Sequence, residues 1–163
     1  MSEIKFDAID RRILQLLQID CAVSNDALAK RVHTSPATCL RRVKRLVEIG
    51  VIEHQVAILA PDRVGAGLAA VVEVTLDRQG AELQDAFEAR VAADAAVQQC
   101  YRTAPGPDFV LIVYVADMAG YQALAQRLFT SDGNVRNVRT YFVTKRAKFG
   151  TGLPVMGVEV MDR

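Results

Sequence analysis

The hydrophobic pattern of this 163-residue chain changes its period near residue 61. Before that point apolar residues recur at helical spacing, as Ile9, Ile13 and Leu16 do. Beyond it, alternating stretches rich in valine, such as residues 68–76, predict strands. Residues 61–67 lie between the two patterns and contain one proline and two glycines, which predicts a hinge. Because the two periods suit different structures, we expect two domains rather than one.

The second half of the chain predicts strands and helices in the order βαββαβ, which is that of a ferredoxin-like split motif. The expected elements are a strand at 68–76, a helix at 81–93, strands at 97–103 and 109–115, a helix at 118–129 and a strand at 135–143. The whole chain is therefore predicted to be α+β. Its expected parts are a helical domain at 1–60, the hinge at 61–67, the ferredoxin-like domain at 68–145 and a tail at 146–163, whose place the pattern does not indicate.

The first sixty residues predict three short helices followed by an extended segment at 52–59. Asp7, Ser24 and Ser35 each precede a helical pattern and can accept a hydrogen bond from the free N–H groups of its first turn. Gly50 follows the third helix, where a left-handed residue commonly ends one. A tight turn at 33–34 separates the second helix from a basic third helix. This arrangement matches a helix-turn-helix.

The third helix, residues 35–49, concentrates positive charge. The formal net charge of the chain is only +1, yet residues 27–47 contain six Lys or Arg and no acidic residue. Leu40, Val43 and Val47 form the expected packed stripe, with Leu46 beside it. Thr38, Arg41, Arg42 and Arg45 are expected to lie outside that stripe. A confined basic surface on a nearly neutral protein is typical of phosphate binding, which makes double-stranded DNA the expected partner.

On this helix the first residues are expected to approach base edges, and the following cations to hold phosphates. The expected DNA-binding residues are Ser35 at the cap, Ala37, Thr38 and Arg41 near the bases, and Arg42, Lys44 and Arg45 at the phosphates. The alternative for the charged residues is an ordinary solvated helix face. Cys39 is expected to be a small buried hydrophobic residue rather than a redox sensor. His33 is either a plain turn residue or a phosphate contact.

Composition argues against several other classes of protein. Hydrophobic residues make up 51% of the chain and charged residues 24%, which predicts a packed core. No apolar run approaches the ~20 residues of a membrane span, and the first ten residues do not resemble a signal peptide. Three cysteines without CxxC spacing and two histidines provide neither a metal set nor a nucleophile with its base. We therefore expect a reduced cytoplasmic protein with no catalytic residues, no metal and no cofactor.

Several motifs together resemble the Lrp/AsnC (feast/famine) family of bacterial and archaeal transcription regulators, over roughly residues 6–145. They are DAIDRRIL at 7–14, SNDALAKRV at 24–32, TSP at 34–36, the RRVKRL run at 41–46 with GVI at 50–52, and, in the second half, DM at 117–118 and RTY at 139–141. The resemblance implies a winged-helix-like DNA-binding domain and an αβ domain that dimerises and senses small molecules. It also implies dimers that assemble into octamers, with an amino-acid effector bound between dimers.

The loop before the third strand of the ferredoxin-like domain departs from the family pattern. The family has Gly-Asp-Phe/Tyr-Asp there, whereas this chain has Pro105-Gly106-Pro107-Asp108. The resemblance carries effector-binding roles over to Asp108, Met118 and Thr140, and Gly106 is added from its place in the loop. For Asp108 the alternative is a turn or capping residue. Two prolines stiffen the loop and remove two backbone donors, which predicts an altered or absent effector.

These observations predict a sequence-specific DNA-binding transcription regulator, associated with the nucleoid, whose activity or assembly responds to a small effector such as an amino acid. The third helix would enter the major groove as part of a dimer. A first alternative is an architectural DNA-binding protein of the same fold without an effector, which the two prolines motivate. A second is an enzyme built on the ferredoxin-like half, which lacks a recognisable active-site cluster.

Overall fold

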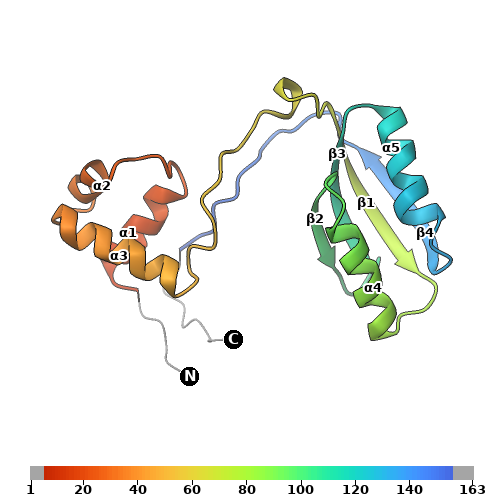
Figure 1. The fold of residues 1–163 in the computed structure, drawn as a ribbon, viewed down its shortest axis with the longest axis horizontal. Helices are drawn as coiled ribbons and strands as arrows, with labels where there is room; N and C mark the ends of the chain where they lie inside the picture. The colour runs from red at the N-terminus through yellow and green to blue at the C-terminus, as the bar shows by residue number, and fades with distance from the viewer. Residues whose placement is uncertain (1–5, 156–163) are drawn as a thin grey trace. The chain divides into compact units, whose positions relative to one another are not determined.

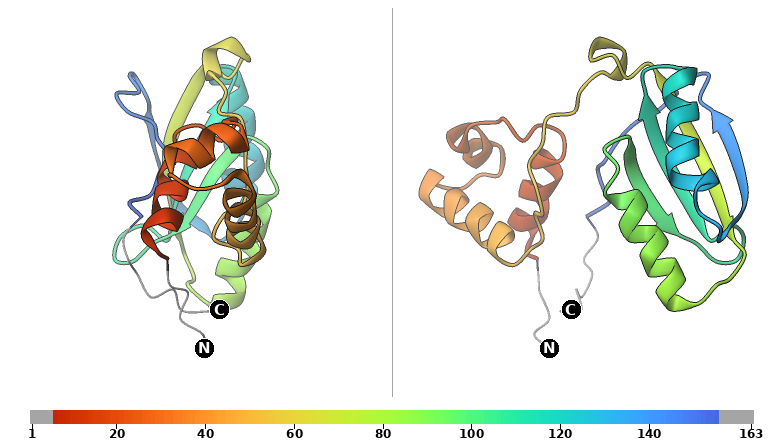
Figure 2. Two further views of the ribbon diagram at one scale, coloured as in Figure 1. Left: turned by 90° about the vertical axis from the view of Figure 1, so that its left-hand side faces the viewer. Right: turned by 45° about the vertical axis from the view of Figure 1, so that its right-hand side comes forward.

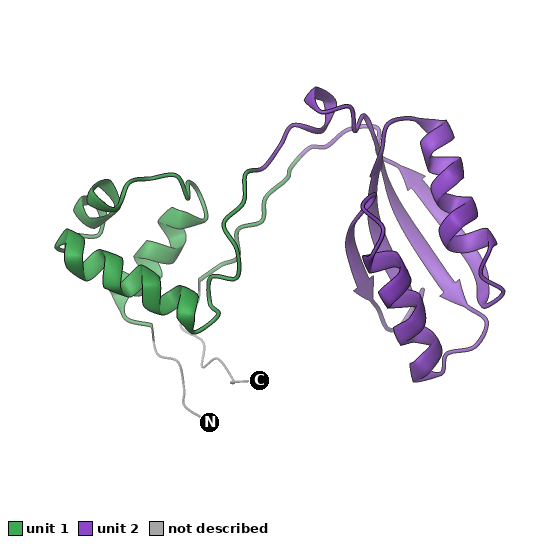
Figure 3. Ribbon diagram, in the orientation of Figure 1, with its two compact units in different colours: residues 1–57, 148–163 green, residues 58–147 purple. Residues whose placement is uncertain are grey.

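A computed structural model of the chain describes residues 6–155 (Figure 1). It divides into two compact units, one holding the residues up to 57 together with those from 148 onward, and the other residues 58–147 (Figure 3). Each unit has a hydrophobic core of its own. Residues 148–155 of the tail thus belong with the N-terminal helices.

The first unit consists of three helices, α1 (Ala8–Leu17), α2 (Asn25–Arg31) and α3 (Pro36–Glu48). The three predicted caps are confirmed, because the side chains of Asp7, Ser24 and Ser35 each accept a backbone N–H three residues on. Gly50 has φ +71°, the left-handed conformation expected after α3. Ile13, Leu28, Cys39 and Leu46 are fully or almost fully buried where the helices meet.

The segment that follows α3 is extended but unpaired. Residues 53–60 are exposed, and within the described chain they belong to no sheet. The segment predicted to be extended is therefore an unpaired connection rather than a strand of a sheet. A single 3₁₀ turn, Pro61–Arg63, and Gly65 with φ +76° follow it, in the region where the composition predicts a hinge.

The C-terminal tail is anchored on the end of α1. The side-chain amide of Gln18 donates to the carbonyl of Leu153 at 3.1 Å, and its carbonyl accepts the Leu153 N–H at 2.5 Å. Val155 packs against the core of the same unit. Gln18 therefore satisfies both backbone groups of one tail residue, as a neighbouring β-strand would.

The second unit is a four-stranded antiparallel sheet with strand order β2-β3-β1-β4. Its elements are β1 (Leu68–Leu76), α4 (Ala81–Ala92), β2 (Val97–Arg102), β3 (Phe109–Val115), α5 (Met118–Ala125) with a single π-helical turn (Gln126–Thr130), and β4 (Val135–Phe142). The βαββαβ order and the α+β class are confirmed. Both helices cover the same face of the sheet (Figure 2).

Alternation along the strands divides the sheet into a packed face and an open face. In β1, Ala70 and Val72 are buried against the helices, whereas Val71 between them points the other way and is half-buried. Register brings Ile112 and Tyr141 opposite Val71 on the two neighbouring strands. The open face is therefore apolar at its centre, although the described part of this unit leaves it uncovered.

Replacing Gln18 by alanine should release the tail from α1, because the two hydrogen bonds to Leu153 are lost. Hydrogen exchange followed by mass spectrometry should show faster exchange in residues 148–155, with about 1 kcal/mol or less of lost stability for these exposed bonds. Gln15→Ala, at an exposed position of the same helix, is the matched control. Unchanged exchange of the tail in Gln18→Ala would contradict the anchoring role.

Candidate nucleic-acid interface

The outward face of α3 carries exposed residues at helical spacing. Ala37, Leu40, Arg41 and Lys44 follow one another at i, i+3, i+4 and i+7, and all four are exposed. The inward face consists of Cys39 and Leu46, both fully buried, with Val43 half-buried between them. One side of the helix is thus free to meet a partner while the other packs on α1 and α2.

The predicted apolar stripe of α3 is partly wrong. Leu40 and Val47 are 45% and 49% exposed, so they do not pack into the core. The spacing 39–43–46 is as helical as 40–43–47, and contact with the other two helices selects the first. Cys39 is buried as predicted, and burial raises the pKa of its thiol, which keeps it protonated and poorly reactive.

The start of α3 is held by side chains of the helix-turn-helix itself. Ser35 Oγ accepts the Thr38 N–H at 3.2 Å and donates to Thr38 Oγ1 at 2.9 Å. Asn25 of α2 donates its side-chain amide to the Pro36 carbonyl at 2.9 Å. His33 makes the tight turn between the helices with φ +53°. The first turn of α3, which includes the predicted contacts Ser35, Ala37 and Thr38, is therefore preorganised.

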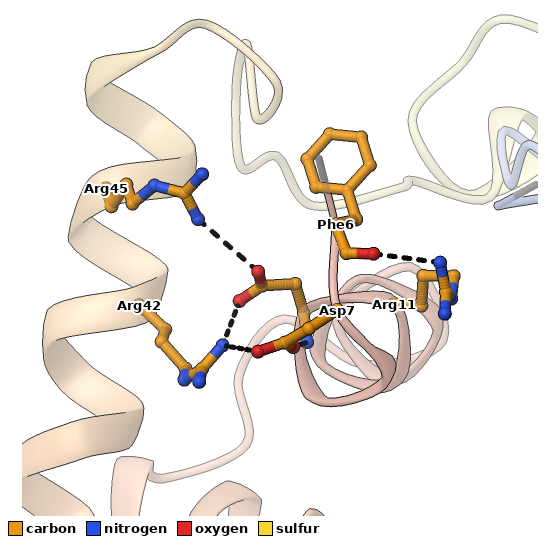
Figure 4. Close-up of polar contacts among 6 residues, drawn as sticks. Phe6, Asp7, Arg11, Arg42 and Arg45 are labelled. Carbon is orange, nitrogen blue, oxygen red and sulfur yellow. Dashed lines mark hydrogen bonds and ion pairs between the residues drawn. The ribbon is translucent and has the colours of Figure 1, made fainter. Parts of the chain in front are cut away.

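Two arginines of α3 converge on carboxylates from α1 (Figure 4). Arg42 Nη1 donates to Asp10 Oδ1 at 2.8 Å and to Asp7 Oδ2 at 2.7 Å, and Arg45 Nη1 donates to Asp10 Oδ2 at 3.3 Å. The side chain of Asp10 is only 3% exposed, so its charge needs these partners. We name these four residues, Asp7, Asp10, Arg42 and Arg45, the Asp10 cluster.

The Asp10 cluster gives Arg42 contacts that the sequence did not indicate. Its side chain is 21% exposed, and hydrogen bonds to Asp10 and then Asp7 raise the pKa of its guanidinium. The phosphate contacts predicted for Arg42 and Arg45 stay predictions, and both residues also join α3 to α1.

The sequence pattern did not identify Asp10 as part of this site. The sequence signal that could have done so is its position three residues before Ile13 on the apolar side of α1, where a charged side chain requires a partner.

The Asp10 cluster forms the wall of a hollow on the surface of the first unit. The hollow has a volume of about 510 Å³, and Phe6 and Arg41 complete its lining. Three guanidinium groups therefore surround a space that water reaches, with two carboxylates between them. Arg41 differs from Arg42 and Arg45 in forming no ion pair within residues 6–155.

The four residues predicted to bind an effector lie in different surroundings. Asp108 is 6% exposed, and its Oδ2 accepts the N–H of Leu76 at 2.7 Å. Gly106 precedes it with φ +131°. Met118 is 47% exposed at the start of α5, and the Thr140 hydroxyl is hydrogen-bonded to that of Tyr121. Asp108 thus has a structural contact with the last residue of β1, and its contact with an ammonium group stays a prediction.

The sheet does not bring these four residues together in one copy of the chain. Gly106 and Asp108 lie just before Phe109, which pairs with Val74 near the end of β1. Met118 follows Val115, which pairs with Leu68 at the start of β1. Leu68 and Val74 are six residues apart along β1, which corresponds to a distance of roughly 20 Å between the two ends of the sheet. A single effector cannot touch Asp108 and Met118 of the same protomer.

Residues 6–155 also bear on two other kinds of site. This part of the chain has no group of three or more His, Cys, Asp or Glu side chains placed to hold a metal ion. None of its helices combines the length and the apolar character that crossing a membrane requires.

Comparison with known proteins gives matches over both units. Residues 6–47 match the AsnC-type helix-turn-helix domain, and residues 69–153 match the Lrp/AsnC ligand binding domain. The leucine-responsive regulatory protein of Salmonella typhimurium is 37% identical over 87% of this chain and 87% of its own. The DNA-binding transcriptional activator DecR of Escherichia coli is 35% identical over 91% of this chain and 98% of its own.

A solved structure also matches. The crystal structure of a transcriptional regulator from Neisseria meningitidis in complex with L-Met is 31% identical, with a TM-score of 0.86. The match covers 92% of this chain and 97% of that one.

The ion pair and helix cap of Asp7 predict how the first unit responds to acid. Its hydrogen bond from the Asp10 N–H and the nearby Arg42 lower the pKa of Asp7 below the ordinary 3.8. Because the folded-state pKa is depressed, this stabilisation is present above pH ~4 and is lost as the pH falls through the lowered pKa. Urea unfolding between pH 2 and 7 should show this loss.

Two substitutions separate the cap from the charge. Asp7→Ala should lower the free energy of unfolding at pH 7 by about 1 kcal/mol, because it removes the cap. Asp7→Asn keeps a capping side chain and should be milder, while removing this residue's part of the acid dependence. An acid dependence identical to that of the unchanged protein in Asp7→Asn would contradict the assignment.

Proposed function

The chain belongs to the Lrp/AsnC family of transcriptional regulators, and from this premise we propose that it reads specific DNA sequences with α3 and responds to an amino acid. The family matches make it a regulator with a DNA-binding helix-turn-helix and a ligand-binding domain. The relatives in these comparisons are transcriptional regulators rather than enzymes, in agreement with the sequence prediction of a protein without catalytic residues.

The outward face of α3 is the observation that carries the DNA-binding proposal. Ala37 and Arg41, near the preorganised start of the helix, would reach base edges in the major groove. Exposed Leu40 lies beside them and suits the methyl group of a thymine. Lys44, one turn further along, would hold a phosphate. Binding of this kind localises the protein to the nucleoid.

Dimerisation is proposed for the open face of the sheet. Val71, Val110 and Ile112 form its apolar centre, and Tyr101 and Tyr141 flank it with 53% and 47% exposure. Apolar surface of this kind is typical of an interface between subunits. Two recognition helices in a dimer would read half-sites one helical turn apart, or a multiple of it. Assembly of dimers into octamers is proposed from the family resemblance.

An amino-acid effector is proposed because the Neisseria meningitidis regulator was solved with L-Met. Asp108 and Met118 lie at opposite ends of the sheet, so one site that uses both takes them from different protomers. An effector bound there would favour one assembly over another. The architectural alternative is supported by Asp108, whose Oδ2 accepts the Leu76 N–H, and by the two prolines beside it.

The DNA-binding face is tested by Arg41→Ala combined with Lys44→Ala. Each exposed cation should contribute one phosphate or base contact, so the double variant should lose specific binding to the promoter in a gel-shift. The slope of log K against log[salt] should become shallower by about 1 per bound helix, because Lys44 is the phosphate contact of this pair and Arg41 the base contact. The control pair Arg78→Ala with Arg136→Ala removes the same charge from the second unit. Specific binding retained by the first pair would refute the assigned face.

The effector is tested by calorimetry of the full chain against the twenty amino acids, with sedimentation velocity in the presence of any that binds. We expect heat from at least one amino acid and a shift in assembly. Asp108→Ala should abolish the heat, whereas Asp77→Ala, at an exposed position following β1, should not. Absence of heat from all twenty would favour the architectural alternative.

A further inference from the structure

The Asp10 cluster places a nearly buried carboxylate against two arginines of the recognition helix. Both oxygens of Asp10 are used, Oδ1 by Arg42 and Oδ2 by Arg45. Asp7 adds a second carboxylate to Arg42. Of the four cations on α3, two are therefore matched by acids of α1, and only Arg41 and Lys44 lack an ion pair among residues 6–155.

The two arginines are held to different degrees. Arg42 has two carboxylate partners within 2.8 Å and is 21% exposed, so it serves as a bridge between helices. Arg45 has one partner at 3.3 Å and is 44% exposed, so a phosphate can reach its guanidinium. Carboxylate and phosphate oxygens bind a guanidinium in the same way and therefore compete for it.

The competition between carboxylate and phosphate for Arg45 would take place at the surface hollow, where DNA would lie. Arg41, which belongs to the outward face, lines it together with Arg42 and Arg45. A phosphate near Arg41 would therefore meet all three guanidinium groups if Asp10 carried no charge. The charge of Asp10 lowers the local positive potential and withholds one contact from any DNA, whatever its sequence.

We propose that Asp10 is a specificity-determining residue that limits non-specific DNA affinity by holding Arg45, together with Arg42, away from phosphate. This inference rests on the proposed DNA-binding function. Phosphate contacts strengthen binding to every sequence equally, so withholding one leaves relatively more of the binding energy to base contacts. Asp10 acts through the arginines and is a positioning residue, since it makes no contact with DNA itself.

The test measures the salt dependence of full-chain binding to a duplex of unrelated sequence, with variants confirmed as folded by circular dichroism. Asp10→Asn should bind this duplex roughly 10-fold more tightly at 50 mM salt, and its log K against log[salt] should steepen by about 1 per bound helix. Asp26→Asn, which removes an exposed acid from α2, is the charge-matched control and should change the slope by much less.

Energetic coupling between Asp10 and Arg45 distinguishes a role of Asp10 in limiting DNA affinity from a purely structural role. Adding Arg45→Gln to Asp10→Asn should cancel the gain in slope, whereas Arg45→Gln alone should change the slope little. A structural role alone would instead weaken binding in Asp10→Asn without steepening it. An unchanged or shallower slope in Asp10→Asn would overturn the inference while leaving the DNA-binding proposal intact, and no binding by the unchanged protein would overturn both.

If Asp10→Asn does not fold, single substitutions in the otherwise unchanged chain decide the question. Lys44→Gln should make the slope shallower by about 1 per bound helix, and Arg45→Gln by less than half as much. A loss of slope with Arg45→Gln as large as that with Lys44→Gln would overturn the inference.

Discussion

The ion pairs between Asp10 and the two arginines of α3 are the interaction on which the DNA-binding unit depends. Asp10 is buried, so its charge is tolerated only while Arg42, its closer and less exposed partner, stays in place. Removing one partner of a buried pair typically costs about 3–5 kcal/mol, because the other charge is left without compensation. The same contacts therefore position α3 on α1 and decide which cations of α3 remain for a partner.

This arrangement separates two tasks along a single helix. Cys39 and Leu46 bury the inner side, the Asp10 cluster occupies the edge toward α1, and Ala37, Arg41 and Lys44 form the outer side. The second unit follows a similar division, with one face of its sheet packed under α4 and α5 and the other open and apolar. Each unit thus presents one surface to a partner, and the chain passes between the units twice, at residues 57–58 and 147–148.

Much of the fold could be predicted because its determinants are local. A few neighbouring residues determine the helix caps at Asp7, Ser24 and Ser35 and the alternation along β1. The observed helices and strands agree with the predictions made from these local patterns. The packed side of α3 could not be chosen this way, since both candidate stripes have helical spacing and only contact with α1 and α2 separates them. The tail has no periodicity, and its anchor lies 135 residues away at Gln18.

The candidate site shows the same limit more sharply. A run of cations on a capped helix predicts a DNA-binding surface, but it does not show that acids 32 and 35 residues earlier neutralise two of the charges.

We infer that α3 meets DNA with its outward face while Asp10 retains Arg42. The most direct measurement is a crystal structure of the full chain on its operator, read at the distance between Arg42 Nη1 and Asp10 Oδ1. We expect this distance to stay near 2.8 Å with Arg41 and Lys44 on the DNA. An Arg42 that leaves Asp10 for a phosphate would contradict it.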